Sequence, residues 1–170
     1  MELVTVILAI MAVFALQYFR KRRKKSSKKN FKNTDEFVQW LASEAIKDAR
    51  RQNHVELDYS VESIRRVDDV LASLHNQYLK NAPSVSLNGQ ASSYGAYVGE
   101  VIRRSEPGAK WAIDDPVGGE KSYPIIWGGG HSYPMAWCYR RIVNGPEDNV
   151  WVKYQALKAR GPNPPALQTQ

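Results

Sequence analysis

The stretch ASSYGAYVGEVIRR, residues 91–104, predicts a helix against which other segments of the chain pack closely. It places Gly95 and Gly99 four residues apart, so both lie on one face of a helix. Each glycine costs about 1 kcal/mol relative to alanine in a helix interior. The pair is therefore expected where another segment lies against the helix backbone. Because charged residues such as Glu100 and Arg103 adjoin the pair, this contact is expected in a water-soluble domain.

Two amphipathic helices are predicted before this stretch. The first is expected from about Asp35 to Gln52 with Thr34 as its N-cap, and the second begins after ELDYS with Ser60 as its cap. Both carry apolar residues at helical spacing: Val38, Leu41, Ala42, Ala45, Ile46 and Ala49 in the first, and Val61, Ile64, Val67, Leu71, Leu74 and Tyr78 in the second. A short connection joins them, so we expect an antiparallel helix pair.

After the glycine helix the period changes from helix to strand. AKWAIDD (residues 109–115) and SYPIIWG (residues 122–128) predict two strands of a hairpin, with Gly118 and Gly119 in its turn. The following GGGHS is interpreted as a flexible connection. A helix is then expected over YPMAWCYRRIVNG, and residues 146–158 favour a further helix over a strand.

The N-terminal region has the pattern of a membrane anchor. Residues 3–19 carry no charge and would span about 26 Å as a helix, close to the thickness of a bilayer core. Lys and Arg crowd immediately after this run, whereas a cleaved secretion signal carries its basic residues before the apolar run. Because basic flanks stay in the cytoplasm, we expect a single-pass anchor in the inner (plasma) membrane, with the N-terminus outside.

The positive charge of the chain is confined to this region. The formal net charge is +7, yet nine basic residues lie between Arg20 and Lys32, which leaves 15 Lys and Arg against 16 Asp and Glu from Asn33 onward. A nucleic-acid partner is therefore not expected. Anionic lipid headgroups are the expected contact of the basic run, through Arg20, Lys21, Arg22, Arg23, Lys24 and Lys25.

These features predict an α+β protein in four parts. Residues 1–19 form a transmembrane anchor and residues 20–33 a basic juxtamembrane linker. Residues 34–158 form a cytoplasmic domain in which the helix pair and further helices pack on a small antiparallel sheet. The proline-rich residues 159–170 form a disordered tail.

The order of segments in the domain resembles that of a family of small bacterial domains of unknown function. The resemblance is carried by LDYSVESIRRVDDVL, by YGAYVGEVIRR followed by Trp111, and by a hairpin and an aromatic helix ending in RRIVNG. It covers about residues 55–157 and implies two helices paired with a small antiparallel sheet, with no assigned reaction. Similar domains occur among bacterial self-protection and contact-dependent competition loci, which by analogy implies an immunity-type binding role.

Aromatic residues supply the candidate binding surface. Ten Trp and Tyr residues crowd between Tyr94 and Tyr154, and such residues anchor many protein interfaces. We expect a partner-binding rim around the glycine loop, with the aromatic residues exposed, formed by Tyr123, Trp127, His131 and Tyr133.

Several residues have a structural interpretation and a chemical one. His131 could act as a general base on a mobile loop, but a histidine beside a glycine turn is more often simply exposed. Asp114, Asp115 and Glu120 could bind Ca²⁺, although Asp-Asp-Pro also favours a plain turn, which we prefer. Cys138 is expected to be a buried apolar side chain.

Glu100 is expected to be partly buried, and a buried carboxylate needs a partner. The expected partners are Arg140 and Arg141, in a structural ion pair. The single cysteine excludes an internal disulfide and a multi-cysteine zinc site, and we predict no cofactor, no metal and no catalytic residue.

Three functions remain open from the sequence. The first is a membrane-anchored cytoplasmic module that binds a protein partner, in the manner of an immunity protein. The second is a membrane-proximal enzyme that uses Glu100 and His131 in acid–base chemistry. The third is a scaffold that binds anionic lipid through its basic run.

Overall fold

The computed structural model describes residues 30–81 and 87–159, and the elements below belong to one compact unit that begins at Lys32. The predicted anchor, most of the basic linker and residues 160–170 of the predicted tail lie outside the described residues. Within the described ranges, no helix combines the length and the apolar character needed to cross a membrane.

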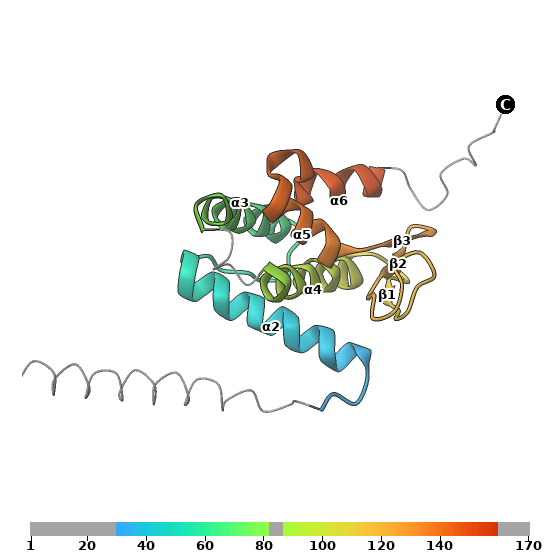
Figure 1. Cartoon of the computed structure of the whole chain (residues 1–170). Helices are drawn as coiled ribbons and strands as arrows, with labels where there is room; N and C mark the ends of the chain where they lie inside the picture. The colour runs from blue at the N-terminus through green and yellow to red at the C-terminus, as the bar shows by residue number, and fades with distance from the viewer. Residues whose placement is uncertain (1–29, 82–86, 160–170) are drawn as a thin grey trace, which may run out of the picture. The chain divides into compact units, whose positions relative to one another are not determined.

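The described part is an α+β fold of five α-helices and one small antiparallel sheet, as predicted (Figure 1). Its elements in chain order are α2 (Thr34–Asn53), α3 (Ser63–Asn81), α4 (Leu87–Ser105), β1 (Lys110–Trp111), β2 (Ile125–Trp127), β3 (Gly130–Ser132), α5 (Pro134–Asn144), the short 3-10 helix η2 (Pro146–Asp148) and α6 (Val150–Ala159).

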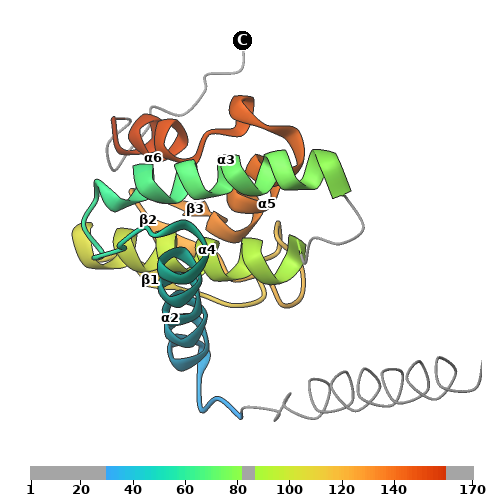
Figure 2. The same ribbon diagram turned by 90° about the vertical axis from the view of Figure 1, so that its left-hand side faces the viewer.

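Helix α4 lies at the centre of the unit. It packs against α2 on one side and α5 on another, while α3 packs against α5 and α6 (Figures 1 and 2). Every residue from Tyr94 to Ile102 is buried, so α4 has no solvent-facing stripe in that segment. The predicted antiparallel pair of the first two helices is therefore wrong. The apolar face of α2 meets α4, because α4 offers a buried surface on more than one side.

The two glycines of α4 lie at close contacts, as predicted. A Cβ atom on Gly95 would lie 2.3 Å from the Cα of Met135 in α5. A Cβ atom on Gly99 would lie 2.1 Å from the Cη2 of Trp111 in β1. Both distances are far below van der Waals contact, so glycine is what lets α5 and β1 approach the helix.

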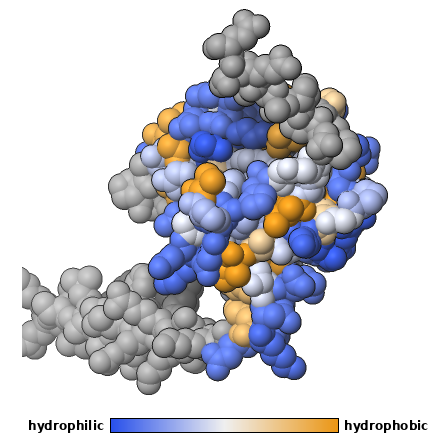
Figure 3. Space-filling view, turned by 90° about the vertical axis from the view of Figure 1, so that its right-hand side faces the viewer, coloured by the Kyte–Doolittle hydropathy of each residue, from blue (hydrophilic) through white to orange (hydrophobic). Residues whose placement is uncertain are grey.

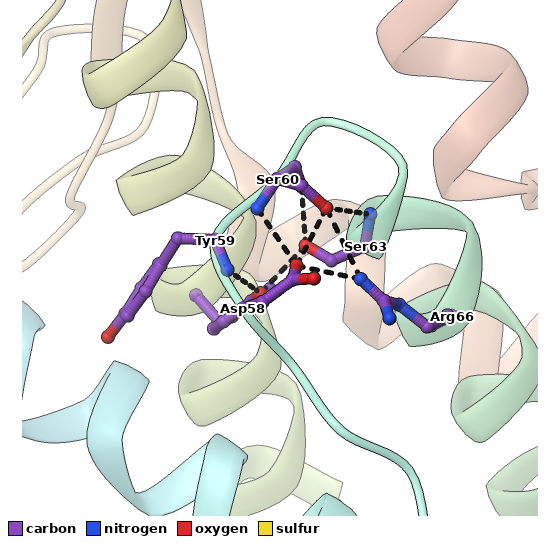
Figure 4. A network of polar contacts seen from close by, with 6 residues as sticks. Asp58, Tyr59, Ser60, Ser63 and Arg66 are labelled. Atoms are coloured by element: carbon purple, nitrogen blue, oxygen red, sulfur yellow. Dashed lines mark hydrogen bonds and ion pairs between the residues drawn. The ribbon is translucent and has the colours of Figure 1, made fainter.

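The helices before α4 begin at side-chain caps. In α2 the cap is Asn33, whose Oδ1 accepts from the Glu36 N–H at 2.9 Å, so the choice of Thr34 was wrong by one residue. Ser60 Oγ accepts from the N–H of Ser63, the first residue of α3, at 3.2 Å (Figure 4). In the same loop the Tyr59 N–H donates to the Tyr97 hydroxyl at 2.7 Å, which ties the loop to α4.

The sheet has the order β1-β2-β3, with both pairs antiparallel. The predicted hairpin is present in β1 and β2. However, GGGHS is not a flexible connection, because Gly130, His131 and Ser132 form β3 and pair with β2. Gly128 and Gly129 join the two strands with φ values of 56° and 76°. A two-residue hairpin turn of this kind needs positive φ at both positions, which glycine supplies without strain.

The predicted C-terminal helices are confirmed. Helix α5 starts at Pro134 and is followed by Gly145, and residues 150–159 form α6 instead of a strand. A buried ion pair fastens these helices to α3: Arg141 Nε lies 3.1 Å from Asp68 Oδ1. The same carboxylate accepts from the Val150 N–H at 2.8 Å, at the start of α6.

Candidate functional site

The side chain of Asp115 is the centre of a polar cluster at the edge of the sheet. Its carboxylate is buried and accepts hydrogen bonds from the Tyr133 hydroxyl and from Nδ1 of His131. The backbone N–H groups of Val117 and Gly118 also donate to it, at 2.8 and 3.1 Å. The Tyr133 hydrogen bond and the other donors hold the pKa of Asp115 well below its ordinary value, although burial opposes this shift. The carboxylate is therefore ionised at neutral pH.

The bond from Val117 makes residues 115–117 an Asx turn, in which an aspartate accepts from the N–H two residues ahead. The preferred turn interpretation of Asp-Asp-Pro is thus confirmed. Gly118 belongs to the same turn, and a Cβ there would lie 2.6 Å from the Tyr133 ring. Within the described residues, no three His, Cys, Asp or Glu side chains gather as a metal site requires.

His131 is oriented by this cluster. Its side chain is 44% exposed, and in the described part of the chain its hydrogen-bond partner is Asp115. Because an ionised carboxylate accepts from Nδ1–H, the neutral ring presents Nε2 as an acceptor. That arrangement could orient a base, but no hydroxyl or thiol of the described residues hydrogen-bonds to the ring.

Two cavities share Tyr133 as a wall. The first, of about 460 Å³, lies between the loop 117–123 and α5, and we call it the Lys121 cavity. The described residues that line it are Ser92, Val117, Gly118, Lys121, Ser122, Tyr123, Tyr133, Met135, Ala136 and Arg140. The second, of about 310 Å³, lies between β3, α5 and α6, and we call it the His131 cavity. It is lined by His131, Ser132, Tyr133, Trp137, Lys153, Ala156 and Leu157.

Three of the four predicted partner-binding residues lie at these cavities. Tyr123 and Tyr133 line the Lys121 cavity, and His131 lines the other. The two tyrosines are half-buried, and Tyr123 packs against Phe37 of α2 with ring centroids 5.1 Å apart. We call the two cavities together the Tyr133 surface. Figure 3 views the end of the unit that carries the sheet, where apolar residues form separate patches among hydrophilic ones.

The expected exposure of Trp127 is wrong. Its side chain is buried, its Nε1 donates to Ser132 Oγ at 3.0 Å, and its ring stacks on Tyr154 of α6. The reason is strand alternation, because Ile125, Trp127 and the cross-strand Ser132 share the core-facing side of the sheet. A strongly exposed apolar side chain is instead found in the Asx turn, where Val117 is 88% exposed.

Glu100 is a structural carboxylate, but its predicted partners are wrong. It is fully buried and accepts from Arg103 at 2.8 and 2.9 Å and from the Trp111 indole at 2.9 Å. Arg104 lies 3.6 Å away. The predicted partners pair elsewhere: Arg140 lies 3.7 Å from Asp148, and Arg141 pairs with Asp68.

Helical spacing explains the choice of partners. Arg103 and Arg104 are three and four residues after Glu100, on the same face of α4. Burial raises the pKa of Glu100, but the hydrogen bonds from Arg103 and Trp111 outweigh it and leave the pKa below its ordinary value. Glu100 and His131 share no hydrogen-bond partner in the described part of the chain.

Sequence reasoning missed that Asp115, His131 and Tyr133 form one cluster. A signal was present for two of the three residues, His131 and Tyr133. If GGGHSY is interpreted as a glycine turn followed by a strand, His131 and Tyr133 are two residues apart and project to one side, while Ser132 projects to the other. No known protein-family model, curated protein or solved structure matches this chain.

Proposed function

We propose that this chain is a membrane-anchored module that binds a protein partner through the Tyr133 surface. The observation that carries the proposal is the pair of cavities that share Tyr133, with Tyr123 and His131 at their walls. Aromatic side chains held in place before binding lose little conformational entropy when a partner docks. The bond from Tyr133 to Asp115 supplies this fixation.

The location in this proposal comes from the N-terminal sequence. Residues 3–19 serve as the membrane anchor, the basic run from Arg20 to Lys25 contacts anionic lipid, and the domain lies in the cytoplasm. The partner is then a protein that reaches the inner face of the membrane, as an incoming toxin does in an immunity-type role. A reporter that is active only outside the cytoplasm, fused to the C-terminus, tests this topology. Strong reporter activity would refute it.

Partner binding is tested with the full chain in native membranes. Proteins captured by crosslinking are identified by mass spectrometry, and each is then purified and tested for direct binding. Tyr133→Ala is expected to lower the affinity at least tenfold. Truncating an aromatic side chain that a partner buries at the centre of an interface typically costs about 2 kcal/mol or more of binding free energy. Tyr133→Phe keeps the ring and is expected to lose less.

The matched control is Leu79→Ala. Leu79 is an exposed apolar residue of α3 and lines neither cavity. Its replacement is expected to leave partner binding unchanged. If Tyr123→Ala and Tyr133→Ala bind the purified partner as well as Leu79→Ala does, the Tyr133 surface is not the binding site.

A further inference from the structure

We propose that the Lys121 cavity receives a carboxylate on an aliphatic stem, so that the partner docks with an aspartate or glutamate of an acidic segment. This inference rests on the proposed function, because it names the chemistry of the partner that the Tyr133 surface binds. It is carried by the charges, the hydrogen-bond donors and the apolar groups that line the cavity.

The cavity wall is positively charged. Lys121 has no ion-pair partner for its ammonium group among the described residues. Arg140 is 53% exposed, and its contact with Asp148 is long, at 3.7 Å. A contact this long with an exposed arginine is weak and leaves the guanidinium able to bind a second anion. None of the described residues that line the cavity carries a carboxylate.

The nearby carboxylate of Asp115 does not neutralise these charges by direct contact. Its two oxygens are already occupied by Tyr133, His131 and two backbone N–H groups, and its side chain is buried. The two backbone bonds hold Val117 and Gly118 in place. In the same loop the Lys121 N–H donates to Oδ1 of Asp114 at 2.7 Å, while the Lys121 ammonium group makes no ion pair with that carboxylate. The cavity is therefore formed before a ligand arrives, which lowers the entropy cost of binding.

The remaining lining groups fit a carboxylate with a short apolar stem. The hydroxyls of Ser92 and Tyr123 can donate to an anion, and neither has a hydrogen-bond partner in the described part of the chain. Val117, Met135 and Ala136 supply apolar contacts beside them. A phosphorylated ligand would instead favour a cluster of arginines, whereas this cavity has one arginine among its described lining residues.

Met135 offers a direct reporter of occupancy. The chain contains three methionines, Met1, Met11 and Met135, and the last lines the cavity. The full chain is labelled with ¹³C at the methionine methyl groups and purified in a zwitterionic detergent. The Met135 signal is assigned with Met135→Leu. The probes are N-acetyl-glutamate amide, its glutamine and lysine analogues, and inorganic phosphate.

The expected result is a saturable shift of the Met135 methyl signal with the glutamate probe, at least tenfold weaker with the glutamine analogue. Lys121→Gln and Arg140→Gln are each expected to weaken binding about twofold to fivefold, as loss of one exposed charge contact does. Lys110→Gln is the control, because Lys110 is exposed on β1 and lines neither cavity. In each variant a dispersed Met135 signal shows that the domain is folded.

The double variant with Lys121→Glu and Arg140→Glu is expected to reverse the preference, from the glutamate probe to the lysine analogue. Equal responses to the glutamate and glutamine probes, or no saturable shift, would overturn the inference. Tighter binding of phosphate than of the glutamate probe would also overturn it, in favour of a phosphorylated ligand.

Failure of the inference differs from failure of the proposed function. If the glutamate probe does not bind while Tyr133→Ala still loses the purified partner, the binding surface is retained and the acidic chemistry is wrong. The other outcome is that the probe binds as expected, but Tyr133→Ala and Arg140→Gln both bind the partner as tightly as the wild type does. In that case the cavity does not receive the partner.

Discussion

The indole Nε1 of Trp111 donates to Oε1 of Glu100 at 2.9 Å, and this bond fastens the first strand of the sheet to the central helix. The same indole ring occupies the space that a side chain on Gly99 would need. A glycine, a glutamate and a tryptophan thus act together at the end of α4. The position of the sheet relative to the helices depends on them.

Alanine at either helix glycine is expected to destabilise the domain. For Gly95→Ala the new methyl group would meet the backbone of Met135 at 2.3 Å, and backbone cannot rotate away. We expect the free energy of unfolding to fall by about 1–3 kcal/mol, the usual cost of overpacking a core. Gly99→Ala is expected to act similarly by displacing Trp111. Urea unfolding of the full chain in detergent, followed by Trp fluorescence, measures both.

Gly130→Ala is the matched control for these variants. Gly130 lies in β3, and a Cβ there would meet no atom within 4 Å. The change is expected to alter the free energy of unfolding by less than about 0.5 kcal/mol. If Gly95→Ala and Gly99→Ala were as stable as Gly130→Ala, the close contacts at α4 would be wrong.

Replacing Glu100 with glutamine is expected to cost stability in a pH-dependent way. The folded-state pKa of Glu100 is lowered by Arg103 and Trp111 against the opposing effect of burial. A lowered pKa stabilises the fold above the unfolded-state value, about 4.3 for glutamate, and that stabilisation is lost as the pH falls below it. We expect Glu100→Gln to lose about 1–3 kcal/mol at pH 7. The loss stays moderate because Arg103 and Arg104 are 34% and 42% exposed and can turn to water.

The measurement is the unfolding free energy of both proteins from pH 7 down to pH 3. The difference between them is expected to shrink below about pH 4. A difference that stays constant across this range would mean that the charge of Glu100 is not what stabilises the contact.

Helix predictions from the sequence succeeded because each depends on local pattern. The apolar spacing from Val38 to Ala49, the proline at the start of α5 and Gly145 after its end are local signals, and the structure follows them. What could not be predicted was which faces meet. The stripes of α2 and α3 resemble the two halves of a helix pair, yet α2 packs against α4.

The same limit applies to the site. Glu100 was recognised as a paired carboxylate, but its partners were chosen by charge type alone. Helical spacing to Arg103 was the stronger guide, because residues three apart on a helix are neighbours. Trp127 was misplaced because the short strands of this sheet give too few residues for alternation to be recognised. The link from Asp115 to His131 spans 16 residues, and no local pattern specifies it.

Asp115→Asn is expected to loosen the Tyr133 surface and to remove one pH-dependent component of stability. The pKa of Asp115 is lowered chiefly by the Tyr133 hydrogen bond, so the ionised carboxylate stabilises the fold above its unfolded pKa of about 3.9. That stabilisation declines as the pH falls below this value. Thermal unfolding of the wild type is therefore expected to show a decrease in Tm below about pH 4 that is smaller in Asp115→Asn.

Asp69→Asn serves as the control for this experiment, because Asp69 is exposed on α3 and its carboxylate makes no hydrogen bond in the described part of the chain. Its pH profile is expected to match that of the wild type. At pH 7 the Asp115→Asn protein is also expected to show altered NMR signals for the Tyr133 ring. An unchanged ring environment would contradict the bond between the two side chains.

Cys138 is expected to be unreactive in the folded protein. Its thiol is fully buried in α5, and burial, aided by the negative charge of Asp68, raises its pKa far above the ordinary value. The thiolate is the species that alkylating reagents attack, so folded protein at pH 8 should resist iodoacetamide. After unfolding in urea, the same thiol should react at the rate of a free cysteine. Mass spectrometry of the full chain measures the added group.

Gly95→Ala, which is expected to separate α5 from α4, should speed labelling of Cys138 in the native protein, whereas Gly130→Ala should not. Rapid labelling of the wild type would show that the contact between α4 and α5 opens readily, contrary to the packing at Gly95.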